Sequence, residues 1–387
     1  MPAKGTKDGS STRPLTVREV NACSFESWYG VFRYRASSSV SSSSLSSSGE
    51  KGVRRWITVK SEIIELDEKF IEWLGTDGIL LPKPRCGAAL HPCDPRVNME
   101  YDDNVEEGCP PIAEFYDLER RIESAITSLG GDVFPKLSWS CPVDASWVSG
   151  GSLKCRSAGE IFLLLKSSDF VQHDLRNAYD HCVSSKDEAM RRPVLVLRKW
   201  FDFSPSMEFR CFVDDNELVA ACQRYCGVHY PFLSSKREEL ASIIDSFFEK
   251  YVRRVFSLDR YTIDVYVDKK GRAWIVDFAP LARGPQSADA PPPHALLSWK
   301  QLESLCGVDS SAADRDDDDD DVFRELRIVE STEEVDSQRT KVLGMHRVPI
   351  EIATGELNSS NIADYLEKLQ KLQVDQDAAF SSDDETS

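Results

Sequence analysis

Apolar and polar residues alternate in two stretches of the chain, and each stretch predicts an antiparallel hairpin. The first stretch pairs Glu208–Val213 with Leu218–Arg224 around the turn residues Asp214–Asn216. The second runs from Tyr261 to Pro280, with Asp268–Gly271 as its turn. Short turns rich in glycine, asparagine and aspartate join neighbouring antiparallel strands. We therefore expect four strands arranged as two hairpins.

Other segments carry apolar residues at every third or fourth position, which is the helical period. This pattern predicts helices over Phe115–Leu129, Ala158–Leu165 and Lys236–Val252. Ser235 and Glu238 have the spacing of a capping box, so we expect the third helix to begin after this serine. Further order is expected in short stretches, which are the strands 133–137 and 193–200, the segments 54–64 and 324–329, the helices 70–74 and 296–305, and the tail segments 342–352 and 362–372.

Several segments lack the apolar residues that a core requires. Residues Ser37–Ser48 are serine except for Val40 and Leu45, and Asp316–Asp321 is a run of six aspartates. Such runs bury no apolar surface and favour disorder. We expect residues 1–20 and an insertion at 36–52 to be disordered, residues 82–111 to form a long loop, and residues 306–387 to be an acidic, partly disordered extension.

Composition narrows the classes of function. The 387 residues include 47 Lys and Arg against 65 Asp and Glu, a net charge of −18. This charge argues against binding to nucleic acid or to an anionic membrane surface, and it suits a basic partner. The 11 cysteines are scattered, no stretch resembles a signal peptide, and no apolar run reaches the length of a membrane helix. We expect a cytoplasmic monomer with reduced thiols.

Two aspartates in the second hairpin are the first candidates for chemistry. Side chains alternate along a strand, so Asp264 and Asp277 are expected on one face. If Val267 pairs with Arg272, Asp264 lies opposite Ile275 and Asp277 becomes its diagonal neighbour. Two carboxylates that close repel each other, and a divalent cation, an arginine or protonation of one acid would relieve the repulsion.

Cationic residues on strands or at strand ends supply a matching set. They are Lys136, Arg198, Lys199, Arg210 and Arg224. Lysine and arginine bind phosphates, and Mg²⁺ is commonly held by one or two carboxylates together with phosphate oxygens and water. The set suits a triphosphate with its magnesium ion, although ordinary ion pairs within a sheet would use the same residues. No Walker loop and no dinucleotide-binding glycine motif occurs.

Six separated motifs together resemble the cell division cycle protein 123 family, also called the D123 family. The resemblance extends from Phe25 to about Val348, and its motifs occur in the family's order. They are Phe134–Ala145, Leu163–Asp169, Val196–Trp200, Glu208–Val213, Gln223–Arg224 and Asp277–Pro280.

The resemblance implies an α+β fold of the ATP-grasp type, with two lobes of antiparallel sheets and packed helices and with ATP-Mg²⁺ between the lobes. The lobes implied are an N-terminal lobe over 21–130, a nucleotide-binding lobe over 131–200 and a C-terminal lobe over 201–305. Carried over by motif, the residues expected to contact the nucleotide are Lys136, Ser140, Pro142, Asp144, Arg198, Lys199, Trp200, Glu208, Arg210 and Arg224.

The metal ligands implied by the resemblance are Asp264 and Asp277, with position 279 beside them. The family often carries asparagine at this third position, where the chain has Ala279. One oxygen ligand is therefore missing, and we expect weaker metal binding, since water can take the place of a side chain around Mg²⁺.

The function implied by the resemblance is assembly of eukaryotic translation initiation factor 2 through binding of its gamma subunit. On this hypothesis bound ATP-Mg²⁺ sets the shape of the partner-binding surface, and the chain acts as a chaperone more than as a catalyst. Two alternatives stay open at this point. One is an ATP-grasp ligase that joins a carboxylate to an amine, and the other is a scaffold that binds no nucleotide.

Overall fold

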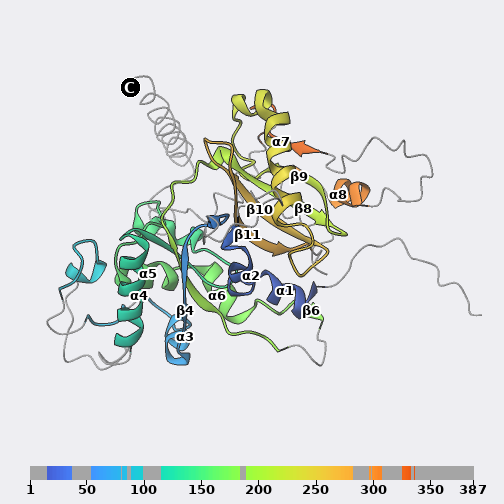
Figure 1. Ribbon diagram of the computed structural model, residues 1–387. Coiled ribbons are helices and arrows are strands. Elements are labelled where there is room, and N and C mark those ends of the chain that lie inside the picture. The colour runs from blue at the N-terminus through green and yellow to red at the C-terminus, as the bar shows by residue number, and fades with distance from the viewer. Residues whose placement is uncertain are drawn as a thin grey trace, which may run out of the picture.

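The computed structural model describes residues 15–36, 54–79, 81–84, 89–98, 115–183, 189–281, 296–297, 299–306, 325–332 and 335. Two sheets dominate these ranges, and helices pack on both of them (Figure 1). The α+β class with antiparallel sheets that the sequence predicts is confirmed. The serine run, the aspartate run and the tail segments at 342–352 and 362–372 lie outside the described residues.

The larger sheet has five strands in the order β11-β10-β8-β9-β12. Both predicted hairpins lie in it. The first is β8 (Glu208–Asp214) with β9 (Glu217–Gln223), and the second is β10 (Tyr261–Val267) with β11 (Ala273–Pro280). An antiparallel pairing of β10 with β8 joins the two hairpins, and the short strand β12 (Leu326–Arg327) runs parallel to β9.

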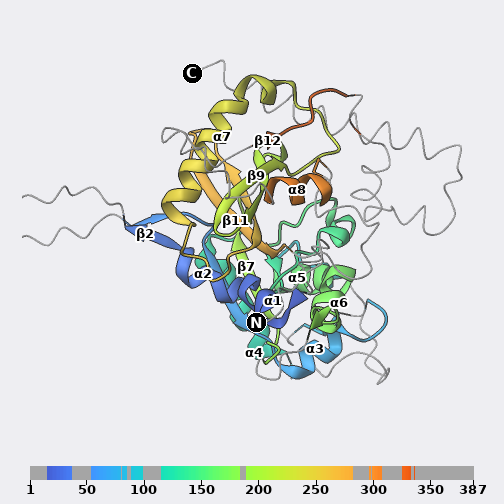
Figure 2. The same cartoon turned by 90° about the vertical axis from the view of Figure 1, so that its right-hand side faces the viewer.

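Helices cover both faces of this larger sheet (Figure 2). One core joins the sheet to α1 (Val17–Cys23), α2 (Phe25–Phe32) and α7 (Pro231–Tyr251). A second, smaller cluster packs α8 (Trp299–Cys306) against Phe212, Ala220 and Cys222 from the other face. One face is therefore closed by α1, α2 and α7, while α8 covers only the β8–β9 part of the other face.

The smaller sheet has three antiparallel strands in the order β4-β7-β5. These are β4 (Ser61–Glu65), β7 (Val194–Lys199) and β5 (Val133–Lys136). Their core also contains α3 (Glu68–Leu74), α4 (Tyr116–Leu129), α5 (Ala158–Lys166) and α6 (Asp169–Arg176). This sheet draws β4 from the predicted N-terminal lobe and β5 and β7 from the predicted nucleotide-binding lobe.

Short elements complete the described chain. Two small pairings are β1 (Leu15–Thr16) with β6 (Cys182–Val183) and β2 (Tyr34–Ala36) with β3 (Arg54–Trp56). Three 3₁₀ turns are η1 (Pro95–Asn98), η2 (Val143–Ser149) and η3 (Pro205–Met207). Among the helices in the described ranges, none combines the length and the apolar character needed to cross a bilayer.

Two predicted boundaries are wrong, and helix capping explains both. Helix α7 begins at Pro231, not after Ser235, because proline suits the first helical turn. The Ser235 hydroxyl instead donates to the carbonyl of Phe232 within the helix. The predicted end of disorder at residue 20 is too late, since Thr16 and Glu19 form a capping box at the start of α1.

The two sheets meet along the edge strand β11. Ile275 of that strand donates from its backbone nitrogen to the carbonyl of Ile57 at 2.7 Å, and the Thr58 hydroxyl donates to the carbonyl of Ile275 at 2.8 Å. Phe25 of α2 donates to the carbonyl of Ser138, just after β5, at 2.8 Å. These bonds tie β11 to the segment just before β4 and tie α2 to the residues after β5, close to where the predicted site residues lie.

Candidate functional site

A β-bulge brings the two candidate aspartates of the hairpin directly opposite each other. Val265 pairs with Ile275, but Asp264 pairs with Asp277, so Val276 is the extra residue on β11. The predicted register is therefore wrong, because Val267 pairs with Ala273 in place of Arg272. The prediction that both carboxylates share one face is confirmed, and they are closer neighbours than expected.

Asp264 is held by two arginines from the neighbouring hairpin. Arg210 lies opposite it on β8 and donates from Nε and Nη2 to its two carboxylate oxygens at 2.6 and 2.7 Å. Arg224 follows β9 and donates from Nε to Oδ2 at 3.2 Å. The aspartate side chain is only 10% exposed. Three predicted site residues therefore form one ion-paired group on the open face of the larger sheet.

Asp277 is held from the other sheet. Lys136, the last residue of β5, donates from Nζ to Asp277 Oδ2 at 2.5 Å. The lysine side chain is fully buried, whereas the aspartate side chain is 22% exposed. The ring of Phe25 lies 5.3 Å from Nζ, so the ammonium group also has a cation–π contact. This ion pair crosses the boundary between the two sheets.

Arg198 is the most unusual cation of the group, because it is almost completely buried and incompletely bonded. It is 1% exposed, and its guanidinium lies 5.3 Å from the ring centroids of both Phe25 and Phe134. Nη1 donates to the carbonyl of Val276 at 2.9 Å, but Nε and Nη2 have no hydrogen-bond partner among the described residues. Burial lowers the pKa of Arg198.

Unpaired guanidinium donors are costly in a protein interior, and an anion that bound here would give Nε and Nη2 of Arg198 a partner. Asp277 is one of the charges that act on Arg198, and the carbonyl that it binds belongs to the bulge residue beside Asp277. The group therefore fits phosphate oxygens. For a divalent ion, two facing carboxylates are available, and within the described residues no group of three or more His, Cys, Asp or Glu could hold a metal.

Glu208 lies two residues before Arg210 on the same face of β8, opposite Tyr266 on β10. Burial raises the pKa of Glu208 to about 7, and the negative charge of Asp264 adds to this effect while Arg224 opposes it. The side chain is thus a polar group beside Tyr266, which lines an aromatic cavity further along the sheet.

The aromatic cavity begins where β7 ends. It has a volume of about 170 Å³ and is lined by Trp56, Thr58, Val59, Lys60, Lys199, Trp200, Phe201, Phe203, Tyr266 and Trp274. Tyr266 and Trp274 face each other across the hairpin, one alternate position along β10 from Asp264. A flat aromatic base would fit such a lining by stacking. The predicted residues Lys199 and Trp200 both lie here.

The loop after β5 carries Ser140, Pro142 and Asp144. Both carboxylate oxygens of Asp144 are used at the start of α6, where they accept from the Ser168 hydroxyl at 2.6 Å and from the Asp169 backbone nitrogen at 2.7 Å. Ser140 donates from its backbone nitrogen and its hydroxyl to Asp174, at 2.8 and 2.7 Å. The loop is therefore bound to α6 at both ends, and Pro142 immediately precedes η2.

Ala279 lies on the same face as Asp277, one alternate position further along β11, and it pairs with Thr262. Its carbonyl accepts a hydrogen bond from the Thr262 hydroxyl at 3.2 Å, and the residue is partly exposed. A longer side chain at this position would start from the face that carries the two aspartates.

Sequence reasoning missed three contributors to this site. Phe25 is where the resemblance begins, but no periodic pattern assigns its ring to Lys136 and Arg198. Asp174 lies on α6, far along the chain from the loop that it binds. The aromatic cavity combines residues from four separate segments. Only the high aromatic content of the segment 200–203 signals it in the sequence.

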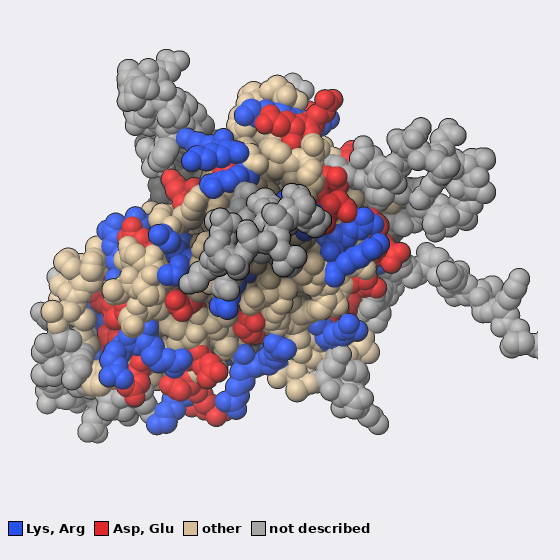
Figure 3. Space-filling model, viewed as in Figure 1, with Lys and Arg blue, Asp and Glu red and all other residues tan. Residues whose placement is uncertain are grey.

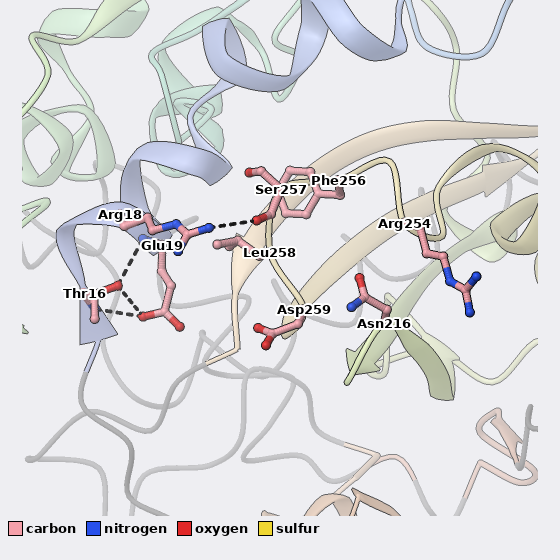
Figure 4. Close-up of a pocket in the computed structure, with 9 residues that line it drawn as sticks. All are labelled: Thr16, Arg18, Glu19, Asn216, Arg254, Phe256, Ser257, Leu258 and Asp259. Atoms are coloured by element: carbon pink, nitrogen blue, oxygen red, sulfur yellow. Dashed lines mark hydrogen bonds between the residues drawn. The ribbon is translucent and has the colours of Figure 1, made fainter.

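A larger cavity, of about 420 Å³, lies at the other end of β10 (Figure 4). Thr16 and Glu19 are bonded to each other at its wall, and Arg18 donates to the carbonyl of Ser257 at 3.4 Å. Arginines and acidic residues are balanced in its lining, which has neither an ion-paired carboxylate couple nor an orphaned donor among the described residues. We therefore assign the candidate site to the Asp264–Asp277 group.

Charged side chains of both signs are mixed over the face of the molecule seen in Figure 3, without one large patch of either sign. The cations of the candidate site differ from these surface charges, because their partners lie within the protein. They lie between two sheets, beside an aromatic cavity, and form the candidate site.

Comparisons with known proteins agree on one family. A model of the D123 family matches residues 54–355. The chain is 31% identical over 374 residues to the translation initiation factor eIF2 assembly protein of Xenopus laevis, covering 94% of this chain and 99% of that protein. It is 32% identical over 384 residues to the protein of the same name in Aspergillus niger, covering 96% and 92%. The solved structure of Cdc123 from Schizosaccharomyces pombe matches with a TM-score of 0.57 and 31% identity, covering 82% of this chain and 99% of that chain.

Proposed function

Since the chain belongs to the D123 family, we propose that it is an ATP-dependent assembly chaperone for translation initiation factor eIF2. Relatives that align over almost their whole length carry the name of eIF2 assembly proteins. On this proposal the chain binds the gamma subunit of eIF2 and promotes its association with the other subunits. It acts in the cytoplasm as a monomer, and its net charge of −18 favours a basic partner.

One observation carries the nucleotide part of the proposal. Lys136, Arg210 and Arg224 bind two facing carboxylates, and nearby Arg198 has two buried donors without partners among the described residues. These cations would bind the phosphates of ATP, and Asp264 and Asp277 would hold Mg²⁺. The aromatic cavity beside Trp200 and Tyr266 would take the adenine base.

Glu208 would lie between base and phosphates, within reach of the ribose. Asp174 would act indirectly, by keeping the loop that carries Ser140 and Pro142 in place beside Lys136. Bound ATP-Mg²⁺ would supply a charged bridge between the two sheets. The cations of β5 and β7 and the carboxylates of β10 and β11 would then be held in one arrangement, which sets the surface offered to eIF2.

The two alternatives predict different fates for ATP. A carboxylate–amine ligase of the ATP-grasp type would convert ATP to ADP when supplied with a small acid and an amine. A scaffold without nucleotide would show no heat of binding when ATP-Mg²⁺ is titrated into it. The assembly chaperone is expected to bind ATP-Mg²⁺ and to keep it intact in the absence of the partner.

The experiment that tests the proposal is a pull-down of purified eIF2 subunits, with and without ATP-Mg²⁺. The variants are Asp277→Asn and a matched control, Asp117→Asn, which removes a carboxylate that is 92% exposed on α4. We expect the wild type and the control to retain the gamma subunit in the presence of ATP-Mg²⁺. Asp277→Asn should retain less of it, with ATP-Mg²⁺ affinity in calorimetry lowered roughly 10-fold or more.

Two results would count against the proposal. If Asp277→Asn binds ATP-Mg²⁺ as tightly as the control does, Asp277 is not a metal ligand. If the wild type retains none of the eIF2 subunits under any condition, the chaperone assignment fails, whatever the nucleotide affinity is.

A further inference from the structure

The oxygens that would hold the divalent ion are already bound by the cations that would hold phosphate. Lys136 Nζ lies 2.5 Å from Asp277 Oδ2. Arg210 is bonded to both carboxylate oxygens of Asp264, and Arg224 also contacts one of them. A metal ion that approaches either carboxylate must therefore compete with a lysine or an arginine.

For Lys136 this competition is severe. Its side chain is fully buried, and among the described residues Asp277 is the acidic group to which Nζ is bonded. Taking Asp277 away would leave the buried ammonium group without the acid to which it is bonded, although the charge of Asp174 also acts on it. Breaking a buried ion pair in this way is strongly unfavourable. The free energy that this costs lowers the metal affinity roughly 100-fold or more.

The overall charge of the group acts in the same direction. The cations Lys136, Arg198, Arg210 and Arg224 are matched in number by the acids Asp264, Asp277, Glu208 and Asp174, the last of which also acts on Lys136. A bare dication therefore meets no net negative charge in this group. A nucleoside triphosphate with its metal ion has a net negative charge, and its phosphate oxygens give every displaced cation a new partner.

We propose that the divalent ion and the nucleotide bind to this site only as one unit, because Lys136 and Arg210 keep the carboxylates from the metal until phosphates replace them. This inference rests on the proposed ATP-binding function. Lys136 ends β5 in the smaller sheet, whereas Asp277 lies on β11 in the larger sheet. When the complex binds, Lys136 would exchange Asp277 for a phosphate and Asp277 would exchange Lys136 for the metal ion. The direct ion pair between the sheets is then replaced by contacts of both sheets with the bound complex.

The first experiment uses the full-length wild-type chain and Mn²⁺, which has the ligand preferences of Mg²⁺ and is detected by electron paramagnetic resonance. Free and bound Mn²⁺ are measured in titrations of the protein alone and of the protein with a non-hydrolysable ATP analogue. Mn²⁺ binding to the analogue itself is measured separately and subtracted. We expect the affinity of the protein for Mn²⁺ to rise roughly 100-fold or more with the nucleotide, and linkage requires the same factor for nucleotide affinity with and without metal.

The second experiment removes the competing cation. In Lys136→Met, Asp277 loses its ammonium partner, so Mn²⁺ alone should bind roughly 10-fold or more tightly than it binds the wild type. The nucleotide should bind more weakly, and the coupling between metal and nucleotide should shrink. The matched control is Lys250→Met, which removes an exposed lysine on α7, outside the site. It should leave both affinities unchanged.

The outcomes separate this inference from the proposed function. If the wild type binds Mn²⁺ equally well with and without nucleotide, the coupling is refuted while nucleotide binding stands. If the wild type binds neither the nucleotide nor its metal complex, both proposals are refuted. If Lys136→Met is folded by circular dichroism and gains no Mn²⁺ affinity over Lys250→Met, Lys136 does not exclude the metal. The wild-type titrations decide the coupling even if Lys136→Met does not fold.

Discussion

Replacing Glu208 with glutamine is expected to stabilise the protein at mildly alkaline pH and to change its stability little in acid. Burial raises the pKa of this carboxyl from 4.5 to about 7. The folded protein therefore favours the protonated form, which glutamine resembles in shape and charge. The ionised form is penalised in the folded state, although in the unfolded chain it is hydrated freely.

The direction of the stability change and the pH range in which it occurs follow from the shift in the pKa of Glu208. A carboxyl whose pKa is raised on folding contributes stability that is fully present below about pH 4.5 and is lost as the pH rises through about 7. The shift corresponds to roughly 3 kcal/mol, since one pKa unit is about 1.4 kcal/mol. Glu208 is partly exposed, and screening by water lowers our expectation to about 2 kcal/mol.

The assay is urea unfolding of the wild type, Glu208→Gln and Glu72→Gln, followed by circular dichroism at several values between about pH 4.5 and 8. Glu72 is exposed on α3 and controls for the loss of one negative charge. The stability gained by Glu208→Gln, relative to the wild type, should grow through this window and level off above about pH 7. A gain that is the same at every pH would refute the reasoning, because the ionisation of Glu208 would then not be the cause.

Two further predictions concern backbone packing and the metal site. In Gly159→Ala the new Cβ would collide with Oδ1 of Asp94, which is 3% exposed and bonded to Arg96. The free energy of unfolding should therefore fall by about 2–4 kcal/mol. Its control, Gly30→Ala, lies in α2 with no atom within 4 Å of the new Cβ and should gain up to about 1 kcal/mol; equal effects of the two changes would contradict the crowding at Asp94. Ala279→Asn would add an amide oxygen on the face of Asp264 and Asp277, and calorimetry should report ATP-Mg²⁺ binding that is tighter by on the order of 1 kcal/mol. The gain should vanish when the metal is chelated, and tightening that survives chelation would mean that the amide contacts the nucleotide or the fold.

Residue type and alternation predicted the charged part of the site well. Asp264 and Arg210 each lie on a strongly patterned strand, so their common face follows from the two-residue period. The sequence could not decide whether these residues form ion pairs in a sheet or bind a ligand. The structure shows why, since Arg210 and Asp264 are cross-strand neighbours in an ordinary ion pair. On the proposed function, the same pair would separate to bind a phosphate and a metal ion.

The parts that the sequence did not predict depend on contacts between distant segments. Arg198 ends an apolar strand in the sequence, but its burial depends on Phe25, which precedes it by more than a hundred residues. In the sequence Asp174 is marked only as an acidic residue. Its contact with the loop at Ser140 depends on the fold. Helical and strand periods describe which face a residue takes, and they carry no information about which element meets that face.

The bulge at Val276 explains why the sequence correctly predicts that Asp264 and Asp277 share one face, although the predicted register is wrong. The observed turn is longer by one residue than the predicted one, since Val267 pairs with Ala273. A shift of one residue exchanges the two faces of a strand, and with this shift alone Asp277 would lie on the face opposite to Asp264. The extra residue at Val276 shifts the register once more and restores the original face. It also directs the Val276 carbonyl to Arg198 Nη1 at 2.9 Å. Bulges are enriched beside functional sites because they redirect a side chain in this way, and here a single inserted residue both pairs the carboxylates and anchors the buried guanidinium.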